Sequence, residues 1–268
     1  MKIKSPYLVK PHAKVKLSRI AANETGGFKS HTAAEDLLVE HRNRLVDLQD
    51  VFNASQKKAL LIVLQGMDTA GKDGAIRHIF SGVNPQGCDV AAFKTPTPLE
   101  KRHDFLWRIH AQVPALGMIQ IFNRSHYEDV LVPGVHKLLP AKTIRKRLDN
   151  IRGFEAMLAD NDVVILKFFL HISQEEQTAR LRSRIDTTDK HWKLSESDFR
   201  ERKFWKEYQA SYEDLLSATS RKHAPWFIIP SDHKWYRNVV ISEILVEVMT
   251  GLKLQYPDPT MDPTKIKL

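Results

Sequence analysis

Five apolar runs are spaced along the chain, and they are its clearest structural signal. They read ALLIVLQ (59–65), CDVAAFK (88–94), GMIQIFN (117–123), VVILKFFLHI (163–172) and APWFIIPS (224–231). Most of them are continuously apolar rather than alternating, which is typical of strands covered by helices on both faces. We therefore predict an α/β fold with a five-stranded parallel sheet.

The segments between these runs carry apolar residues at helical spacing. Helices are predicted over 37–52, 72–80, 99–112, 141–160, 173–185, 197–217 and 239–252. Strands that alternate with helices form βαβ units, so we predict a three-layer sandwich in one domain spanning 1–268. Residues 1–32 are basic and predicted to be an irregular N-terminal arm, and about 173–217 a charged helical insertion of the lid type.

The composition indicates the charge of the binding partner and the cellular location. The 268 residues carry a formal charge of +9, which favours an anionic partner: nucleic acid, acidic membrane, nucleotide or phosphate polymer. One cysteine, Cys88, excludes an intrachain disulfide, and no apolar run is long enough for a membrane span or a signal peptide. We therefore expect a cytoplasmic protein without a membrane partner.

The first strand runs into the sequence GMDTAGKDG, which has the spacing of a phosphate-binding loop. Gly66, four residues, Gly71 and Lys72 match that pattern, and a helix is predicted to follow. Glycines let backbone N–H groups curl around one phosphate, while the lysine and the positive end of the helix add charge. The alternative is a glycine-rich turn between strand and helix without a ligand.

Two aspartates lie in this loop, where an anion should be repelled. Asp73 replaces the usual Ser or Thr, and Asp68 lies at the crest of the loop. Carboxylates can share a pocket with phosphate when a divalent cation lies between them, and Mg²⁺ takes one or two carboxylates plus phosphate oxygens. Asp68 could also orient an attacking oxygen. The alternatives are a turn-stabilising Asp68 and an Asp73 that only interacts with the helix dipole.

Arg124 follows the third strand at the edge of the sheet where ligands of open α/β sheets bind. Its planar fork suits phosphate oxygens. The alternative is a structural ion pair with Glu128 or Asp129.

Four segments together resemble one family. GMDTAGKDG, FNRSHYEDV, KFFLHIS and PWFIIPSDHKWYRN, in this order, are similar to the polyphosphate kinase 2 family over about 37–256. The resemblance implies a P-loop kinase-like fold similar to thymidylate kinase, with phosphoryl transfer between inorganic polyphosphate and nucleotides, Mg²⁺ or Mn²⁺ as cofactor, and a homo-oligomer, dimer or tetramer. The family's functional residues match Asp68, Lys72, Asp73 and Arg124.

The resemblance also bears on the acceptor and on the lid. Glu128-Asp129 resembles the subgroup that accepts both AMP and ADP. Asn123 stands where some members have aspartate, so Asp129 is the residue that we expect in that acidic role. The family's lid arginine, which contacts the transferred phosphate, matches Arg180.

The predicted lid helix carries a basic face of its own. Arg180 and Arg184 lie one helical turn apart, so they share one side of that helix. The alternative is a solvated face paired with nearby glutamates. Lys94, at the end of the second strand, is a further candidate for holding the polyphosphate chain.

The prediction is a reversible, Mg²⁺-dependent phosphotransferase that uses polyphosphate and adenine or guanine nucleotides. Predicted catalytic residues are Asp68, Lys72, Arg124 and Arg180. Predicted phosphate- or nucleotide-binding residues are Gly66, Met67, Thr69, Ala70, Gly71, Lys72, Asp73, Gly74, Lys94, Glu128 and Arg184. Predicted metal ligands are Asp68, Asp73 and Asp129. The alternatives are an ATP-dependent nucleotide kinase and a basic P-loop protein that binds nucleic acid, although no nucleic-acid partner is expected because aromatic and basic residues do not interleave as single-strand binders require.

Overall fold

The sheet has five strands, and all of them pair in parallel. A computed structural model describes residues 3–28, 30–262 and 264. The strands are β1 (Ala59–Gly66), β2 (Cys88–Ala92), β3 (Ile119–Asn123), β4 (Val163–His171) and β5 (Trp226–Pro230). Their order in the sheet is β2-β3-β1-β4-β5. The five-stranded parallel sheet predicted from the apolar runs is confirmed, and β1 lies at its centre.

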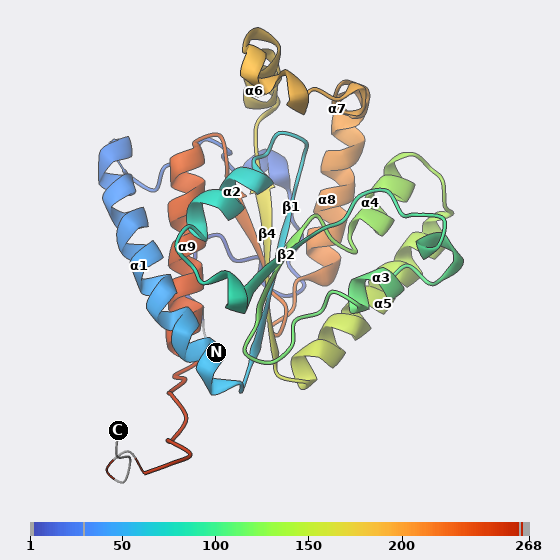
Figure 1. Ribbon diagram of the computed structural model, residues 1–268. Helices are drawn as coiled ribbons and strands as arrows, with labels where there is room; N and C mark the ends of the chain where they lie inside the picture. The colour runs from blue at the N-terminus through green and yellow to red at the C-terminus, as the bar shows by residue number, and fades with distance from the viewer. Residues whose placement is uncertain (1–2, 29, 263, 265–268) are drawn as a thin grey trace.

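Helices cover both faces of this sheet (Figure 1). One layer contains α1 (His31–Ser55), α2 (Lys72–Ile79) and α9 (Lys234–Gly251), and the other contains α4 (Glu128–Val135), α5 (Ala141–Asp160) and α8 (Trp205–Thr219). Every residue of β1 is buried, which explains why this strand is apolar without alternation. The predicted three-layer α/β sandwich is confirmed.

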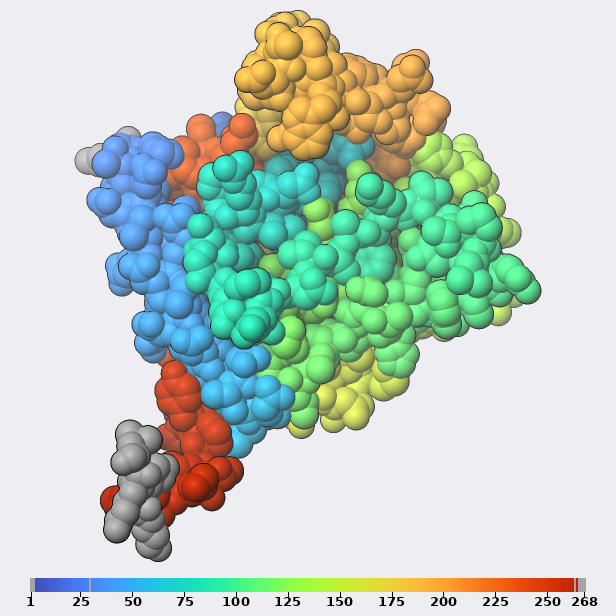
Figure 2. Space-filling view, viewed as in Figure 1, coloured from blue at the N-terminus to red at the C-terminus, as the bar shows by residue number. Residues whose placement is uncertain are grey.

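The lid is shorter than predicted. The helix α6 (Gln174–Asp186), a 3-10 turn at Thr188–Lys193 and α7 (Glu196–Glu201) project above the carboxyl ends of the strands (Figures 1 and 2). The predicted range 173–217 also included most of α8. That helix instead packs against α4 and α5 with Tyr212, Leu215 and Leu216 buried, so it belongs to the covering layer.

The predicted helix over 99–112 is wrong. That segment forms a 3-10 turn at Glu100–Arg102 and one short helix, α3 (Trp107–His110). The carboxylate of Asp104 accepts a hydrogen bond of 2.9 Å from the backbone N–H of Leu106. Such a local side-chain bond closes a turn and competes with a continuous helix.

The sequence patterns missed α4, which follows β3 directly. Pro133 lies inside this helix, and Gly134 follows it. Both residue types argue against a helix when a sequence is considered alone. The helix forms because Val130, Leu131 and Val135 bury their side chains in the core, and packing overrides propensity here.

The N-terminal arm lies along the free edge of β5. The N–H of Val9 donates to the carbonyl of Trp226, and the N–H of Ile228 donates to that of Tyr7, each at 2.9 Å. This short antiparallel contact covers an edge that would otherwise expose unpaired backbone groups. Among the described residues, no helix is long and apolar enough to cross a lipid bilayer. The cytoplasmic location and the homo-oligomer stay predictions.

Candidate active site

A cleft of about 1000 Å³ opens at the carboxyl ends of the strands, beneath the lid. Figure 2 shows the lid segment projecting over this part of the surface. Ten lysine and arginine side chains line the cleft, against five carboxylates. Of the predicted residues, the lining includes Asp68, Thr69, Gly71, Lys72, Asp73, Gly74, Lys94, Arg124, Arg180 and Arg184. An excess of cations with a few acids suits a ligand that carries several negative charges and a bridging cation.

The loop between β1 and α2 wraps one corner of this cleft. Gly71 adopts φ +98°, a left-handed conformation that favours glycine. A Cβ on Gly66 would lie 2.8 Å from the carbonyl oxygen of Leu170 in β4, so only glycine lets the two strand ends approach. The hydroxyl of Thr69 is buried and finds no hydrogen-bond partner within the described chain. The loop thus has the curled backbone and the unused donor that an anion site needs.

Lys72 starts α2 and folds back over the loop. Its ammonium donates to the carbonyls of Gly66 at 2.9 Å and Met67 at 3.3 Å. The side chain is buried and, within the part of the chain that the structure describes, has no ion pair. Burial lowers the pKa of Lys72 to about 8, and the nearby Arg124 acts in the same direction.

Arg124 joins the phosphate loop to the start of α4. Its guanidinium donates to the Asp68 carboxylate at 2.7 Å and contacts that of Glu128 at 3.3 Å. Burial lowers the pKa of Arg124, but these carboxylates outweigh burial, and the pKa lies above its ordinary value. Arg124 forms the ion pair with Glu128 that was the alternative prediction. It also lines the cleft, as a phosphate contact would require.

The two loop aspartates both line the cleft, and each is held by a different partner. Asp73 accepts a hydrogen bond of 2.5 Å from the side-chain amide of Asn123, at the end of β3. Asp68 is held by Arg124. Two carboxylates on one cleft wall fit a magnesium ion that completes its shell with phosphate oxygens and water. In the described chain no three acidic, histidine or cysteine side chains come together as a metal cluster of their own.

Asp129 does not join these aspartates, contrary to the predicted set of three metal ligands. Its carboxylate accepts a hydrogen bond of 3.0 Å from the buried Arg108, and its side chain is outside the lining of the cleft. Asp129 and Glu128 are neighbours in the first turn of α4, so their side chains point in different directions. Glu128 turns towards Arg124, and Asp129 turns into an ion pair with α3.

A buried polar network lies beneath Arg124. Lys167 of β4 is fully buried and donates to Glu155 at 2.6 Å and to the Tyr127 hydroxyl at 2.9 Å, and Tyr127 also donates to Glu155 at 2.7 Å. Burial lowers the pKa of Lys167 to about 8, although Glu155 opposes that shift. Arg124 itself has φ +63°, a strained value for a residue with a Cβ. The network anchors the turn that holds Arg124 in this conformation.

Arg180 is bound by the protein on every side. Its Nε donates to Glu176 at 2.7 Å, one terminal nitrogen donates to the carbonyls of Thr69 and Ala70, and the other donates to those of Ser231 and Asp232. These bonds use all five N–H groups of the guanidinium. Arg180 therefore ties the base of the lid to the phosphate loop and to the end of β5. It could contact a transferred phosphate only by giving up some of these bonds.

Arg184 lies one turn further along α6 and faces the lid. It donates to the carboxylate of Asp198 at 2.7 Å and to the carbonyl of Lys193 at 3.1 Å. Burial raises the pKa of Asp198, with the charge of Asp68 as the next cause. Arg180 and Arg184 share one face of α6, as predicted, but the first binds the loop and the second binds the lid.

The comparisons with known proteins agree with this geometry. The family model described as Polyphosphate kinase 2 matches residues 29–257. The chain belongs to the polyphosphate kinase 2 family. It is 47% identical to an AMP/ADP-polyphosphate phosphotransferase of Meiothermus ruber, over 97% of this chain and 98% of that one. It is 41% identical to an ADP-polyphosphate phosphotransferase of Rhodopseudomonas palustris, over 97% and 94%.

A solved structure supports the same family. The crystal structure of polyphosphate kinase 2 from Arthrobacter aurescens TC1 superposes with a TM-score of 0.93 at 38% identity, covering 98% of this chain and 96% of that one. The fold of this polyphosphate kinase 2 family member is therefore shared over almost its whole length.

Sequence patterns missed the contribution of α9 to the cleft of this family member. Lys234, Trp235, Arg237 and Asn238, all in the first turns of α9, line it. These residues follow β5, and the carboxyl end of a parallel strand is where a ligand-contacting segment is expected. We applied this rule to Arg124 after the third strand. Applied to the segment after the fifth strand, it would have identified these residues as well.

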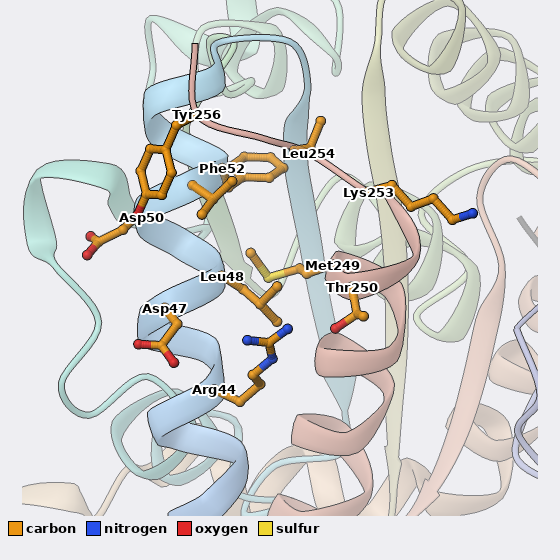
Figure 3. Close-up of a pocket in the computed structure, with 11 residues that line it drawn as sticks. Arg44, Asp47, Leu48, Asp50, Phe52, Met249, Thr250, Lys253, Leu254 and Tyr256 are labelled. Atoms are coloured by element: carbon orange, nitrogen blue, oxygen red, sulfur yellow. The ribbon is translucent and has the colours of Figure 1, made fainter. Parts of the chain in front are cut away.

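A second pocket lies away from this chemistry. It has a volume of about 410 Å³ and lies between α1, the last turn of α9 and the segment that follows α9 (Figure 3). It shares no lining residue with the cleft. Its walls mix apolar side chains such as Leu48 and Met249 with exposed charges, and no buried ionisable group points into it.

Proposed function

We propose that the protein transfers phosphoryl groups between inorganic polyphosphate and adenine nucleotides, converting AMP to ADP and ADP to ATP. The observation that carries this proposal is the cleft itself. It combines a glycine loop, a buried lysine and an excess of arginines and lysines with the two loop carboxylates of Asp68 and Asp73. Two relatives that span nearly the whole chain support the proposal: the name of the Meiothermus ruber protein specifies AMP and ADP, and that of the Rhodopseudomonas palustris protein specifies ADP.

The reaction exchanges one phosphorus–oxygen bond for another. A terminal phosphate oxygen of the nucleotide attacks the terminal phosphorus of the polymer, and a new P–O bond forms. The bond from that phosphorus to the bridging oxygen breaks, and the shortened polymer leaves with the electron pair and the negative charge. A phosphate oxygen needs little help from a base, so positioning and charge neutralisation supply the rate. Because the bonds broken and formed are alike, the reaction runs in both directions.

Two side chains and the backbone of the loop do most of this positioning. Lys72 exchanges a loop carbonyl for a phosphate oxygen, since its ammonium already lies within the loop. Arg124, held by Asp68 and Glu128, presents its remaining N–H groups to the phosphates from the β3 side. The loop N–H groups and the positive end of α2 bind from the β1 side. Together they oppose charge that spreads over the oxygens of the phosphoryl group in transit.

Magnesium or manganese would be held by Asp68 and Asp73, the two carboxylates in the loop. When bound, such an ion neutralises phosphate charge and allows the carboxylates to remain beside the polyanion. Asp129 is not part of this proposal, because its carboxylate is engaged by Arg108.

An acceptor assay tests the proposal. The wild-type protein is mixed with long-chain polyphosphate, Mg²⁺ and either AMP or ADP, with no ATP added, and the nucleotides are separated by chromatography. We expect ADP to appear from AMP and ATP to appear from ADP. Conversion of ADP alone would contradict the proposed use of AMP. Conversion that requires ATP as donor would contradict the use of polyphosphate.

A further inference from the structure

Arg237 contacts the phosphate loop and lines the cleft. It belongs to the first turn of α9, and only 1% of its surface is exposed. One terminal nitrogen donates to the carbonyl of Ala70 at 3.1 Å. A Cβ on Gly71 would lie 2.0 Å from that nitrogen, and one on Gly74 would lie 3.5 Å from the other. The guanidinium thus occupies the space that these two glycines leave at the start of α2.

The charge of Arg237 has no acidic partner in the described chain. Its other donors bind the neutral side-chain oxygen of Asn238, at 3.1 and 2.8 Å. Burial, and then the nearby Arg180, lower the pKa of Arg237 to about 9, which still leaves the group charged at neutral pH. It also lies at the positive end of the α2 dipole. A buried cation in such surroundings is costly unless an anion is close.

The other buried cations of the fold show that this arrangement is unusual. Three of the five buried lysine and arginine side chains have a carboxylate partner: Arg108 with Asp129, Lys167 with Glu155 and Arg180 with Glu176. Within the described residues, the two buried cations without an ion pair are Lys72 and Arg237. Both contact the phosphate loop, and both line the cleft.

We propose that Arg237 is a further phosphate-positioning residue, whose buried charge is balanced by the phosphate that the loop holds. It acts through the loop backbone: together with Arg180 it binds the Ala70 carbonyl, and so it holds the peptide between Ala70 and Gly71 in a fixed orientation. Its charge adds to the field of Lys72 and the α2 dipole at the same point. This inference rests on the proposed function, because it needs a phosphate chain in the loop.

The test compares thermal unfolding with and without inorganic tripolyphosphate or ADP, in wild type, Arg237→Met and Arg237→Lys. Arg145→Met, on the exposed face of α5, controls for the loss of one positive charge elsewhere. Without added ligand, Arg237→Met should unfold at the wild-type temperature or above it, because it removes a buried charge that lacks an opposite charge. Its affinity for tripolyphosphate should fall by about 10- to 100-fold, as expected for one charged hydrogen-bonding group.

Arg237→Lys keeps the charge and should retain most of the affinity, and Arg145→Met should match wild type. The ligand that loses more affinity in Arg237→Met, tripolyphosphate or ADP, identifies whose phosphate occupies the loop. An Arg237→Met protein that is less stable than wild type without ligand but binds both ligands normally would overturn the inference. If Arg237→Met does not fold, Arg237→Lys decides the question. An affinity for tripolyphosphate equal to that of wild type would support the role of the positive charge. An affinity reduced by about 10- to 100-fold would overturn the inference. A wild-type protein that gains no stability from either ligand would instead overturn the proposed function, and this inference with it.

Discussion

The guanidinium of Arg124 lies 2.7 Å from the carboxylate of Asp68, and this contact joins the end of β3 to the phosphate loop that follows β1. The two residues are far apart in sequence, but their strands are neighbours in the sheet. The contact therefore sets the distance between the two walls of the cleft that, in the proposed function, hold the reacting phosphates in line.

Replacing Arg124 should separate activity from stability. Arg124→Ala should lower the rate of phosphoryl transfer by about 10²- to 10³-fold, the usual cost of one donor to the transition state. Arg124→Gly should lose as much activity yet relieve the strain of φ +63°, so its melting temperature should be at least that of Arg124→Ala. Initial rates and thermal melts of both variants check this. Full activity in either would remove Arg124 from the site.

Lys72 should make phosphate binding depend on pH. Its pKa is about 8 in this fold, so the side chain is mostly neutral at pH 9, whereas a bound phosphate favours the charged form. Binding should therefore take up a proton above pH 8, and affinity should fall as the pH rises through 8. Calorimetry of tripolyphosphate binding at pH 8.5, in buffers of different ionisation enthalpy, measures that proton. Lys72→Arg stays charged throughout and should lose the linkage; an unchanged proton uptake in this variant would assign it to another group.

The metal requirement should depend on the loop aspartates and not on Asp129. Chelation should abolish transfer, and Mg²⁺ or Mn²⁺ should restore it. Asp68→Asn and Asp73→Asn should raise the Mg²⁺ concentration needed for half-maximal rate. Asp129→Asn should leave that concentration unchanged and lower the free energy of unfolding by about 1–3 kcal/mol, because it weakens the ion pair of Arg108. A magnesium titration of all three variants measures this, and a shift in Asp129→Asn alone would reverse the assignment.

The buried ion pair between Lys167 and Glu155 should stabilise the fold as a pair, and not through either charge alone. Lys167→Met leaves Glu155 charged and buried, and should lower the free energy of unfolding by about 3–5 kcal/mol. The double replacement Lys167→Met with Glu155→Leu removes both charges and should recover part of that loss. Urea unfolding of the single and double variants measures the coupling. If the two losses simply add, the pair is not the unit that stabilises the fold.

Much of this fold could be predicted from the sequence, because buried strands and a glycine loop leave strong local signals. The five apolar runs placed the sheet correctly, and the GMDTAGKDG segment forms the predicted loop between a strand and a helix. The position of Asp129 could not be derived, because its direction depends on where α4 begins, and Pro133 hid that helix. The helix over 99–112 failed for a similar reason: one Asp104 side chain closes a turn that periodicity does not reveal.

Contacts between residues far apart in the sequence could not be predicted from sequence patterns either. The helical spacing placed Arg180 and Arg184 on one face. It could not show that all the N–H groups of the Arg180 guanidinium donate to backbone carbonyls and to Glu176. Arg237 sits 167 residues from the Ala70 carbonyl that it binds. Such contacts exist only once the sheet order brings the ends of β1 and β5 to the same edge.

The proposed phosphoryl transfer is tested most directly by the initial rate of ATP formation from ADP and long-chain polyphosphate, in ATP-free mixtures, for wild type and Lys72→Ala. We predict that wild type makes one ATP for each phosphate that the polymer loses. Lys72→Ala should retain the wild-type melting temperature but only about one-hundredth of the rate or less. Equal rates in the two proteins, or no ATP from wild type, would contradict it.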